Sequence, residues 1–257
     1  MLTELAILCA GAFFAGLVDA MVGGGGLVQV PLLFNVFPGT APATLFGTNK
    51  AVSIVGTTFA ARRYLGRVEM DWKVLWRAAL AAFVASFAGA AAVGMFPPQM
   101  LRPVVIVLLV AVLAYTLKKK DFGVLRAEAA AHRPKPILAL VLGALIGFYD
   151  GFFGPGTGSF LIFLFVRCYA WDFLRASAAA KVVNVSTNLA ALAWFVPVGA
   201  IMAKVAAAMA VANLAGAWVG AHLAIKNGAS FVRRVFIVVV SVLIARLVWD
   251  TFAGGTS

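Results

Sequence analysis

The chain has 257 residues and a net charge of +12; 63% of its residues are hydrophobic and 12% are charged, which gives a mean hydropathy of +1.02. Soluble globular proteins are about 45–50% apolar, so this composition excludes a soluble globule and predicts an all-α polytopic membrane protein. The basic excess is typical of cytoplasmic loops, and no nucleic-acid-binding motif accompanies it.

The first apolar run, Leu2 to Val22, ends in four successive glycines at Gly23 to Gly26. Such a cluster unwinds a helix. The next segment, Leu27 to Phe37, is too short to cross a bilayer, so we expect a half-helix or re-entrant segment buried against protein. Asp19 lies four residues before the cluster, in a position where a carboxylate is costly in hydrocarbon.

Three more spans follow in the first half, and then comes the most polar stretch of the chain. The spans are expected at about Ala43 to Leu65, Trp72 to Phe96 and Leu101 to Leu117. We therefore divide the chain into a first transmembrane repeat at 1–117, a basic linker at 118–136 and a second transmembrane repeat at 137–257.

The second half repeats the first at a constant offset of 131 positions over roughly a hundred residues. Asp150 follows Asp19 at this offset, and Lys181 follows Lys50. Coincident charged residues do not follow from hydrophobicity alone. We predict an internal duplication, the usual construction of secondary transporters. Each repeat would hold about four transmembrane helices, with one glycine-broken helix and one short re-entrant segment.

The basic segments predict the topology. The positive-inside rule places the loop from Arg62 to Arg77 and the linker in the cytoplasm, and four crossings per half then put both termini there. Lys226, Arg233 and Arg234 count against this assignment. An even number of crossings makes the repeats parallel, whereas counting a short segment as a crossing makes them inverted, and both arrangements stay open.

Two stripes of small residues allow close helix packing. They lie at Ala12, Gly16 and Ala20 and at Gly143, Gly147 and Gly151. The stripes suit packing between the two halves as well as packing between two subunits, so a homodimer is one of the expected assemblies.

The glycine clusters are candidates for an anion site. If half-helices begin at Leu27 and Gly158, their free amides and positive dipole ends point at the breaks. The alternative is tight helix packing, or a hinge that contacts no ligand. A phosphate-binding P-loop is not indicated, because neither cluster is followed by Lys-Ser/Thr.

Four charged residues lie in apolar surroundings. Lys50 and Lys181 suit a counter-ion for an anionic substrate, although Lys50 is close enough to its helix start to reach the interface instead. Asp19 and Asp150 are candidates for proton coupling, and they equally suit pairing with the lysines or capping the unwound backbone.

The expected substrate-binding residues come from both halves. They are Gly23, Gly24, Gly25, Gly26, Asn49, Lys50, Ser53, Gly154, Gly156, Thr157, Gly158, Lys181, Asn184 and Asn188. We expect no catalytic residue, no metal site and no cofactor. The chain lacks a His/Asp metal cluster and a Ser/His pair at matching depth, and its two cysteines show no metal-ligand spacing.

Several motifs resemble the TauE/SafE family of sulfite exporters, also called the toluene sulfonate uptake permease family, and within it the branch typified by YfcA. They are GLVDAMVGGGGLVQVPLL in the first half, GTNKA at Gly47 to Ala51, and GFYDGFFGPGTGSF in the second half. The likeness extends over the whole chain. It implies a bacterial inner-membrane transporter, and relatives with assigned substrates move sulfite, sulfonates, sulfoacetate or thiosulfate.

These observations predict a secondary transporter for small anionic sulfur compounds that works by alternating access between the repeats. The alternatives are an anion channel and a transporter of another small organic anion, and a membrane-embedded enzyme is disfavoured. The expected partners are the anionic substrate and the lipid bilayer, without nucleic acid.

Overall fold

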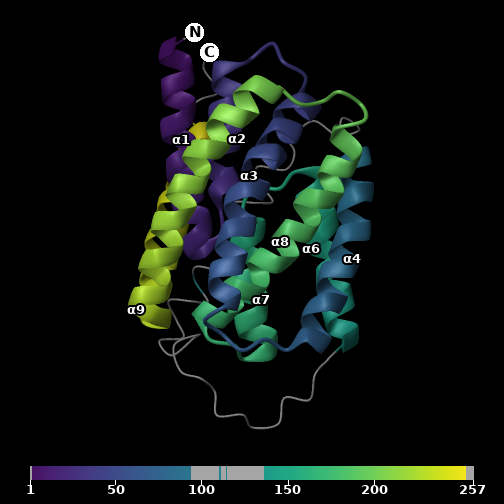
Figure 1. The fold of residues 1–257 in the computed structure, drawn as a ribbon, viewed down its shortest axis with the longest axis vertical. Coiled ribbons are helices and arrows are strands. Elements are labelled where there is room, and N and C mark those ends of the chain that lie inside the picture. The colour runs from purple at the N-terminus through teal and green to yellow at the C-terminus, as the bar shows by residue number, and fades with distance from the viewer. Residues whose placement is uncertain (1, 94–109, 111–113, 115–135, 253–257) are drawn as a thin grey trace.

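The computed structural model describes residues 2–93, 110, 114 and 136–252, and all regular elements in these ranges are helices (Figure 1). The span expected at Leu101 to Leu117 and the linker at 118–136 lie almost entirely outside the described residues. The described helices are α1 (Leu2–Val22), α2 (Gly25–Val36), α3 (Pro42–Leu65), α4 (Trp72–Ala91), α6 (Pro136–Phe152), α7 (Thr157–Tyr169), α8 (Phe173–Phe195) and α9 (Ala203–Phe252).

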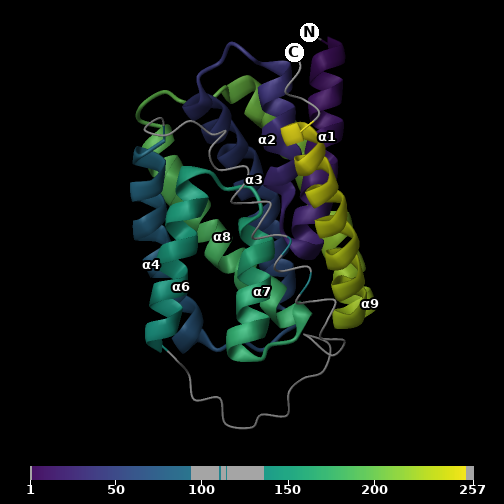
Figure 2. The ribbon, with the colours of Figure 1, turned by 180° about the vertical axis from the view of Figure 1, so that it is seen from behind.

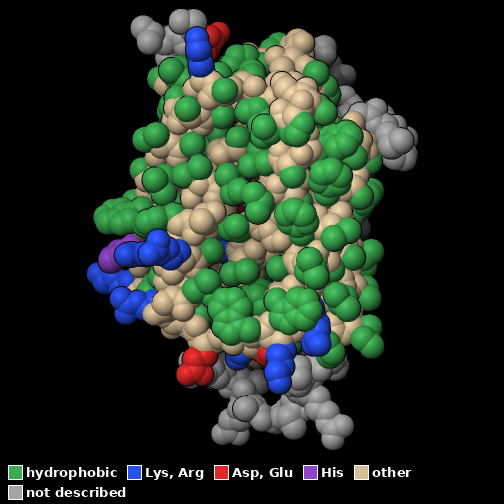
Figure 3. Space-filling model, turned by 45° about the vertical axis from the view of Figure 1, so that its right-hand side comes forward, with side chains coloured by type: hydrophobic (Ala, Val, Ile, Leu, Met, Phe, Trp, Pro, Cys, Tyr) green, Lys and Arg blue, Asp and Glu red, His purple; other side chains and the backbone are tan. Residues whose placement is uncertain are grey.

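Three described helices are long and apolar enough to cross a membrane, at Thr3–Val22, Trp72–Ala91 and Ala203–Val242. Hydrophobic side chains cover most of the flank of the molecule (Figure 3). α2 and α7 have only 12 and 13 residues. At 1.5 Å per residue they extend about 18–20 Å, less than the roughly 30 Å of a hydrocarbon core. The structure is that of a helical membrane protein with two short inner helices.

Local sequence accounts for several helix ends. The carboxylates of Asp71 and Asp172 accept backbone N–H bonds at the starts of α4 and α8, as N-cap residues do. Pro42 occupies the first turn of α3, where it loses no helical hydrogen bond. Within α9 the backbone bends at Gly228, whose φ of 71° suits glycine.

The small-residue stripes pack the two halves of the chain together. A Cβ atom on Gly147 would lie 2.5 Å from Cα of Ala82, so α6 and α4 touch through their backbones. In the same way a Cβ on Gly16 would lie 2.1 Å from the carbonyl oxygen of Asn213, which joins α1 to α9. Both stripes therefore form helix contacts within one chain. They give no support to the predicted homodimer, which stays a prediction.

The orientation of the helices corrects one topology prediction. The amide of Asn213 donates to the carbonyl of Ala12, and its Oδ1 lies against Gly56, so α1, α3 and the first part of α9 are aligned at one level. Their chain directions agree, and the start of α1 lies at the end of the molecule opposite to the basic end of α3 (Figure 1). The basic end of α3 and the termini therefore lie at opposite ends of the molecule, whereas the sequence predicts that they lie on the same side (Figure 1).

The reason lies in the broken helices. α1 enters from one end and α2 returns toward that end, whereas α6 and α7 do the same from the other end (Figures 1 and 2). Each of these helix pairs thus begins and ends toward the same end of the molecule. The first part of α9 runs parallel to α3 and ends just before the bend at Gly228, so Lys226 lines a cavity together with Arg63 and Arg67. Lys226 therefore lies at the basic end and no longer counts against placing that end in the cytoplasm.

Candidate functional site

Two helix breaks, one from each half, are built by glycines in left-handed conformations. Gly23 and Gly24 have φ values of 68° and 119°, and Gly154 and Gly156 have values of 91° and 88°. L side chains rarely adopt these values, so the glycines are required by the backbone itself.

The helices after the breaks begin slightly earlier than the sequence predicts. α2 begins at Gly25 rather than at Leu27, and α7 begins at Thr157 rather than at Gly158. Gly25 is free to adopt helical angles, so only the first two glycines of the cluster lie outside a helix.

The two breaks contact each other directly. A Cβ atom on Gly23 would lie 2.5 Å from Cα of Gly158, and one on Gly26 would lie 3.4 Å from Cα of Pro155. Because α2 and α7 both start here, two positive helix ends meet in the middle of the protein.

Side chains of both halves complete the hydrogen bonding at the end of α1. Ser159 Oγ lies 2.6 Å from the carbonyl oxygen of Gly23 and 3.2 Å from that of Val22, and donates to them. The Tyr64 hydroxyl donates to the carbonyl of Ala20 at 2.8 Å. Unpaired carbonyls are costly in a membrane interior, so these contacts stabilise the break.

A small cavity lies where the breaks meet, with a volume of about 20 Å³. That volume accommodates roughly one water molecule. It is lined by Asp19, Gly24, Gly26, Asn49, Lys50, Ser53, Asp150, Gly154, Gly156, Thr157, Gly158, Asn184 and Asn188. Each of these residues was singled out from the sequence. Gly23, Gly25 and Lys181 were singled out too but do not line the cavity.

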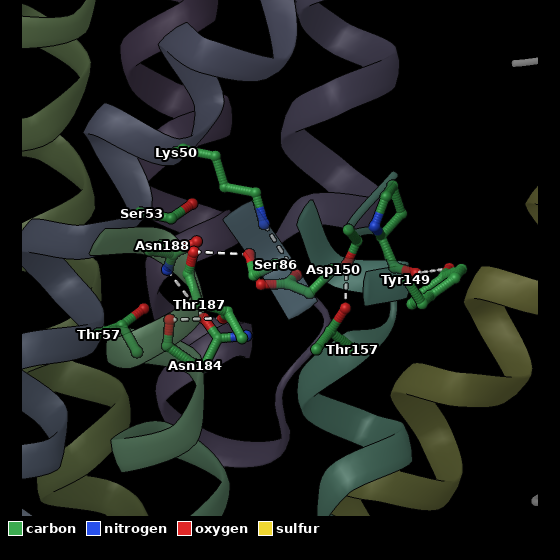
Figure 4. Close-up of polar contacts among 12 residues, drawn as sticks. Lys50, Ser53, Thr57, Ser86, Tyr149, Asp150, Thr157, Asn184, Thr187 and Asn188 are labelled. Carbon is green, nitrogen blue, oxygen red and sulfur yellow. Dashed lines mark hydrogen bonds and ion pairs between the residues drawn. The ribbon is translucent and has the colours of Figure 1, made fainter. Parts of the chain in front are cut away.

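An ion pair crosses the cavity between the halves. Lys50 Nζ of α3 lies 2.8 Å from Asp150 Oδ1 of α6, and both side chains are buried (Figure 4). Within the described part of the chain, neither Asp150 Oδ2 nor Asn49 Oδ1 has a hydrogen-bond partner. Both atoms belong to residues that line the cavity.

Asp19 and Lys181 make different contacts from their counterparts. Asp19 accepts a bond from Thr57 Oγ1 at 3.1 Å and a longer one from the Gly25 amide at 3.4 Å, so it caps the start of α2. Lys181 Nζ lies 5.3 Å from the centre of the Tyr64 ring and interacts electrostatically with Asp19. Of the roles left open for the carboxylates, Asp150 shows lysine pairing and Asp19 shows capping.

Sequence reasoning missed Gln29, Thr57 and Ser159. Gln29 is fully buried in α2 and accepts a bond from Ser53 Oγ at 3.3 Å. A side-chain amide inside a short apolar segment was the available signal for Gln29. On α8, Asn188 donates to Asn184 Oδ1 at 2.9 Å, which fixes both amides beside the cavity (Figure 4).

The chain matches the family model "Sulfite exporter TauE/SafE" over residues 8–247. It is 34% identical to "Probable membrane transporter protein ORF9" of a Sinorhizobium species over 96% of this chain and 93% of the relative. It is 31% identical to a "Probable membrane transporter protein" of Haemophilus influenzae, covering 96% and 95% of the two chains, and 30% identical to YfcA of Escherichia coli K12, covering 96% and 90%. No solved structure matches significantly.

Proposed function

Since the chain belongs to the sulfite exporter TauE/SafE family, we propose that it is a secondary transporter for small anionic sulfur compounds such as sulfite, sulfonates or thiosulfate. The family and the names of the relatives make it a membrane transporter. The observation that carries the proposal is Lys50, a buried cation beside a cavity onto which two positive helix ends open.

The substrate anion would bind at these positive groups. Lys50 supplies a full charge, and the first turns of α2 and α7 supply backbone amides, as in other discontinuous membrane helices. Asn188 on α8 offers a donor, because its bond to Asn184 uses only one of its two amide hydrogens, and Ser53 on α3 offers one if it releases Gln29. A sulfur oxyanion has at least four heavy atoms, so it needs more room than the cavity of about 20 Å³ provides. This conformation is therefore the closed one, and Lys50 must move for the anion to bind.

Anion binding would break the ion pair. When the anion pairs with Lys50, the Asp150 carboxylate is left buried without its counter-ion. A buried unpaired charge is strongly unfavourable at low dielectric. Uptake of one proton by Asp150 removes that charge. The other ionisable groups nearby include Asp19, which keeps its bonds to Thr57 and Gly25, and Tyr149, whose hydroxyl donates to the Pro155 carbonyl. Lys181 also lies nearby, over the Tyr64 ring, but it does not line the cavity. We therefore assign proton coupling to Asp150 rather than to Asp19.

Alternating access would use two repeats of inverted orientation. Contacts that correspond at the offset of 131 support this assignment. Gly89 packs against the carbonyl of Phe148, and Gly220 packs in the same way against that of Leu17. The opposite entry of α1–α2 and α6–α7 favours inverted over parallel repeats (Figures 1 and 2).

The positive-inside rule places the basic end of α3 in the cytoplasm, and both termini would then lie on the outer side of a bacterial inner membrane. Single cysteines introduced at Thr3 and Arg67, in a chain whose native Cys9 and Cys168 are replaced by alanine, test this in intact cells. A membrane-impermeant maleimide should label the first and not the second. The reverse labelling pattern would show that the termini are cytoplasmic.

Transport is tested by uptake into proteoliposomes of labelled sulfite, thiosulfate and a small sulfonate. Wild type is compared with Lys50→Ala and with Lys204→Ala, an exposed lysine away from the cavity. Saturable uptake of one anion that is lost only in Lys50→Ala supports the carrier. Uptake that rises linearly with concentration would favour a channel, and no uptake of any of the three would reject the sulfur-anion substrate.

A further inference from the structure

A second cavity, of about 340 Å³, lies at the basic end of the molecule between α3 and α9. It is lined by Arg63, Arg67, His222, Ile225 and Lys226. None of these residues lines the small central cavity. Three of the five side chains are permanent cations, and a fourth is a histidine. The cavity is therefore separate from the proposed transport site and has the charge of an anion site.

The basic side chains come from the end of α3 and from α9. Arg63 lies in the last turn of α3, and Arg67 lies in the turn that follows this helix. His222 and Lys226 are four residues apart on α9, a spacing that puts both on one face of the helix. No ion pair between these four residues and a carboxylate occurs in the part of the chain that the structure describes. Their charges repel one another, and a bound anion would remove that repulsion.

Aromatic rings hold two of these side chains in place. The Arg63 guanidinium lies over the Phe59 ring at 5.8 Å, and the His222 ring stacks on Trp218 with 6.2 Å between the centroids. Phe59 and Trp218 each lie one helical turn before the basic residue that they contact, toward the hydrophobic flank of the molecule. The polar cavity is thus continuous with apolar surface.

The surface beside the cavity is suited to an acyl chain. Trp218 is 53% exposed and Val211 is 71% exposed, and both lie on the face of α9 that carries His222. Basic side chains gather on one side of the molecule, directly next to hydrophobic surface (Figure 3). A small soluble anion would use only the basic part of this surface, whereas an amphiphile uses both parts.

We propose that this cavity binds the phosphate-bearing headgroup of an anionic phospholipid, with an acyl chain along Val211 and Trp218. Basic pockets between membrane helices on the cytoplasmic side commonly bind such headgroups. The volume of about 340 Å³ is within the range of small-ligand pockets. The bound lipid would join the end of α3 to α9 through its phosphate.

The test is native mass spectrometry of the full-length protein in detergent, titrated with phosphatidylglycerol or with phosphatidylcholine. We expect tighter binding of phosphatidylglycerol to wild type. The double variant Arg63→Gln/Lys226→Gln should lose roughly 30-fold in affinity, because each basic residue near an anionic lipid contributes a factor of about five. Arg62→Gln is the matched control, because Arg62 is exposed beside Arg63 but does not line the cavity.

Each alternative outcome overturns the proposal. Equal affinity for the two lipids would show that the headgroup charge is not recognised. An equal loss in Arg62→Gln would show general surface attraction rather than a site. Inorganic phosphate that competes with phosphatidylglycerol at similar concentrations would assign the cavity to a soluble anion. A charge-conserving Arg63→Lys variant, which should retain binding, guards against a variant that loses its fold.

Discussion

Lys50 and Asp150 are a hundred residues apart in sequence, yet Nζ of the first lies 2.8 Å from Oδ1 of the second in the centre of the protein. The side chains are 3% and 2% exposed, so water screens the pair very little. The pair connects α3 of the first half to α6 of the second. Its position makes these two residues important for stability and, under the proposed function, for transport as well.

Removing one partner of the pair should destabilise the protein. Lys50→Gln leaves a buried carboxylate without its counter-ion, and the expected loss is about 3–5 kcal/mol in the free energy of unfolding. The double variant Lys50→Gln/Asp150→Asn should recover most of that loss, because neither buried group is then charged. Thermal unfolding in detergent measures both effects.

The same double variant separates stability from transport. It should remain inactive in anion uptake although it is folded, because no cation remains at the central cavity. Uptake by the stable double variant would contradict the role of Lys50 as the counter-ion for the substrate.

Asp150→Asn should make anion binding independent of pH. Under the proposed coupling the anion binds to wild type together with a proton, so its affinity should fall as the pH rises. Asparagine mimics the protonated carboxyl, so the variant binds the anion without a proton. Binding of the transported anion between pH 5 and pH 9 measures this difference. Asp19→Asn is the control and should retain the pH dependence of wild type; loss of it in that variant instead would move the coupling to Asp19.

Ser159→Ala should weaken the helix break. It leaves the carbonyls of Val22 and Gly23 without the serine hydroxyl, at an expected cost of about 1–3 kcal/mol. Ser177→Ala is a matched control. Ser177 is also fully buried and also donates to the end of α1, but over the longer distance of 3.5 Å to the Met21 carbonyl. Equal losses in the two variants, measured by unfolding in detergent, would argue against a special role for Ser159.

Gly147→Ala should disrupt the packing of α6 on α4. The added methyl group would lie 2.5 Å from backbone atoms of Ala82, and overpacking of this kind costs about 1–3 kcal/mol. Gly39→Ala, at a position with no atom within 4 Å of the added carbon, should leave the melting temperature unchanged. A similar drop in both variants would show that loss of glycine itself, rather than the contact, is responsible.

The sequence identified most of the candidate site because its residues are unusual in a membrane helix. A carboxylate such as Asp150, a lysine such as Lys50 and a cluster of glycines are all costly in hydrocarbon, so each is conspicuous in an apolar run. The cavity brings them together from both halves. The pairing of Lys50 with Asp150 rather than with Asp19 could not be predicted, because it depends on how the halves face each other.

Other features of the structure could not be predicted from the sequence, for physical reasons. Serine and threonine occur throughout membrane helices, so nothing in the sequence distinguishes Ser159, which donates to Gly23, from the rest. The direction of α2 was also open, because a short apolar segment is compatible with crossing and with returning. That uncertainty placed the termini at the wrong end relative to the basic loop.

The contact between α1 and α9 has a consequence for biosynthesis. Gly16 of α1 lies against the backbone of Asn213, and the end of α1 depends on the hydroxyl of Ser159. Both partners are made long after α1 leaves the ribosome. The first helix must therefore remain in the membrane without these hydrogen-bond and packing partners until almost the whole chain has been synthesised. A chain truncated before α7 should therefore be degraded faster in cells than the full-length chain.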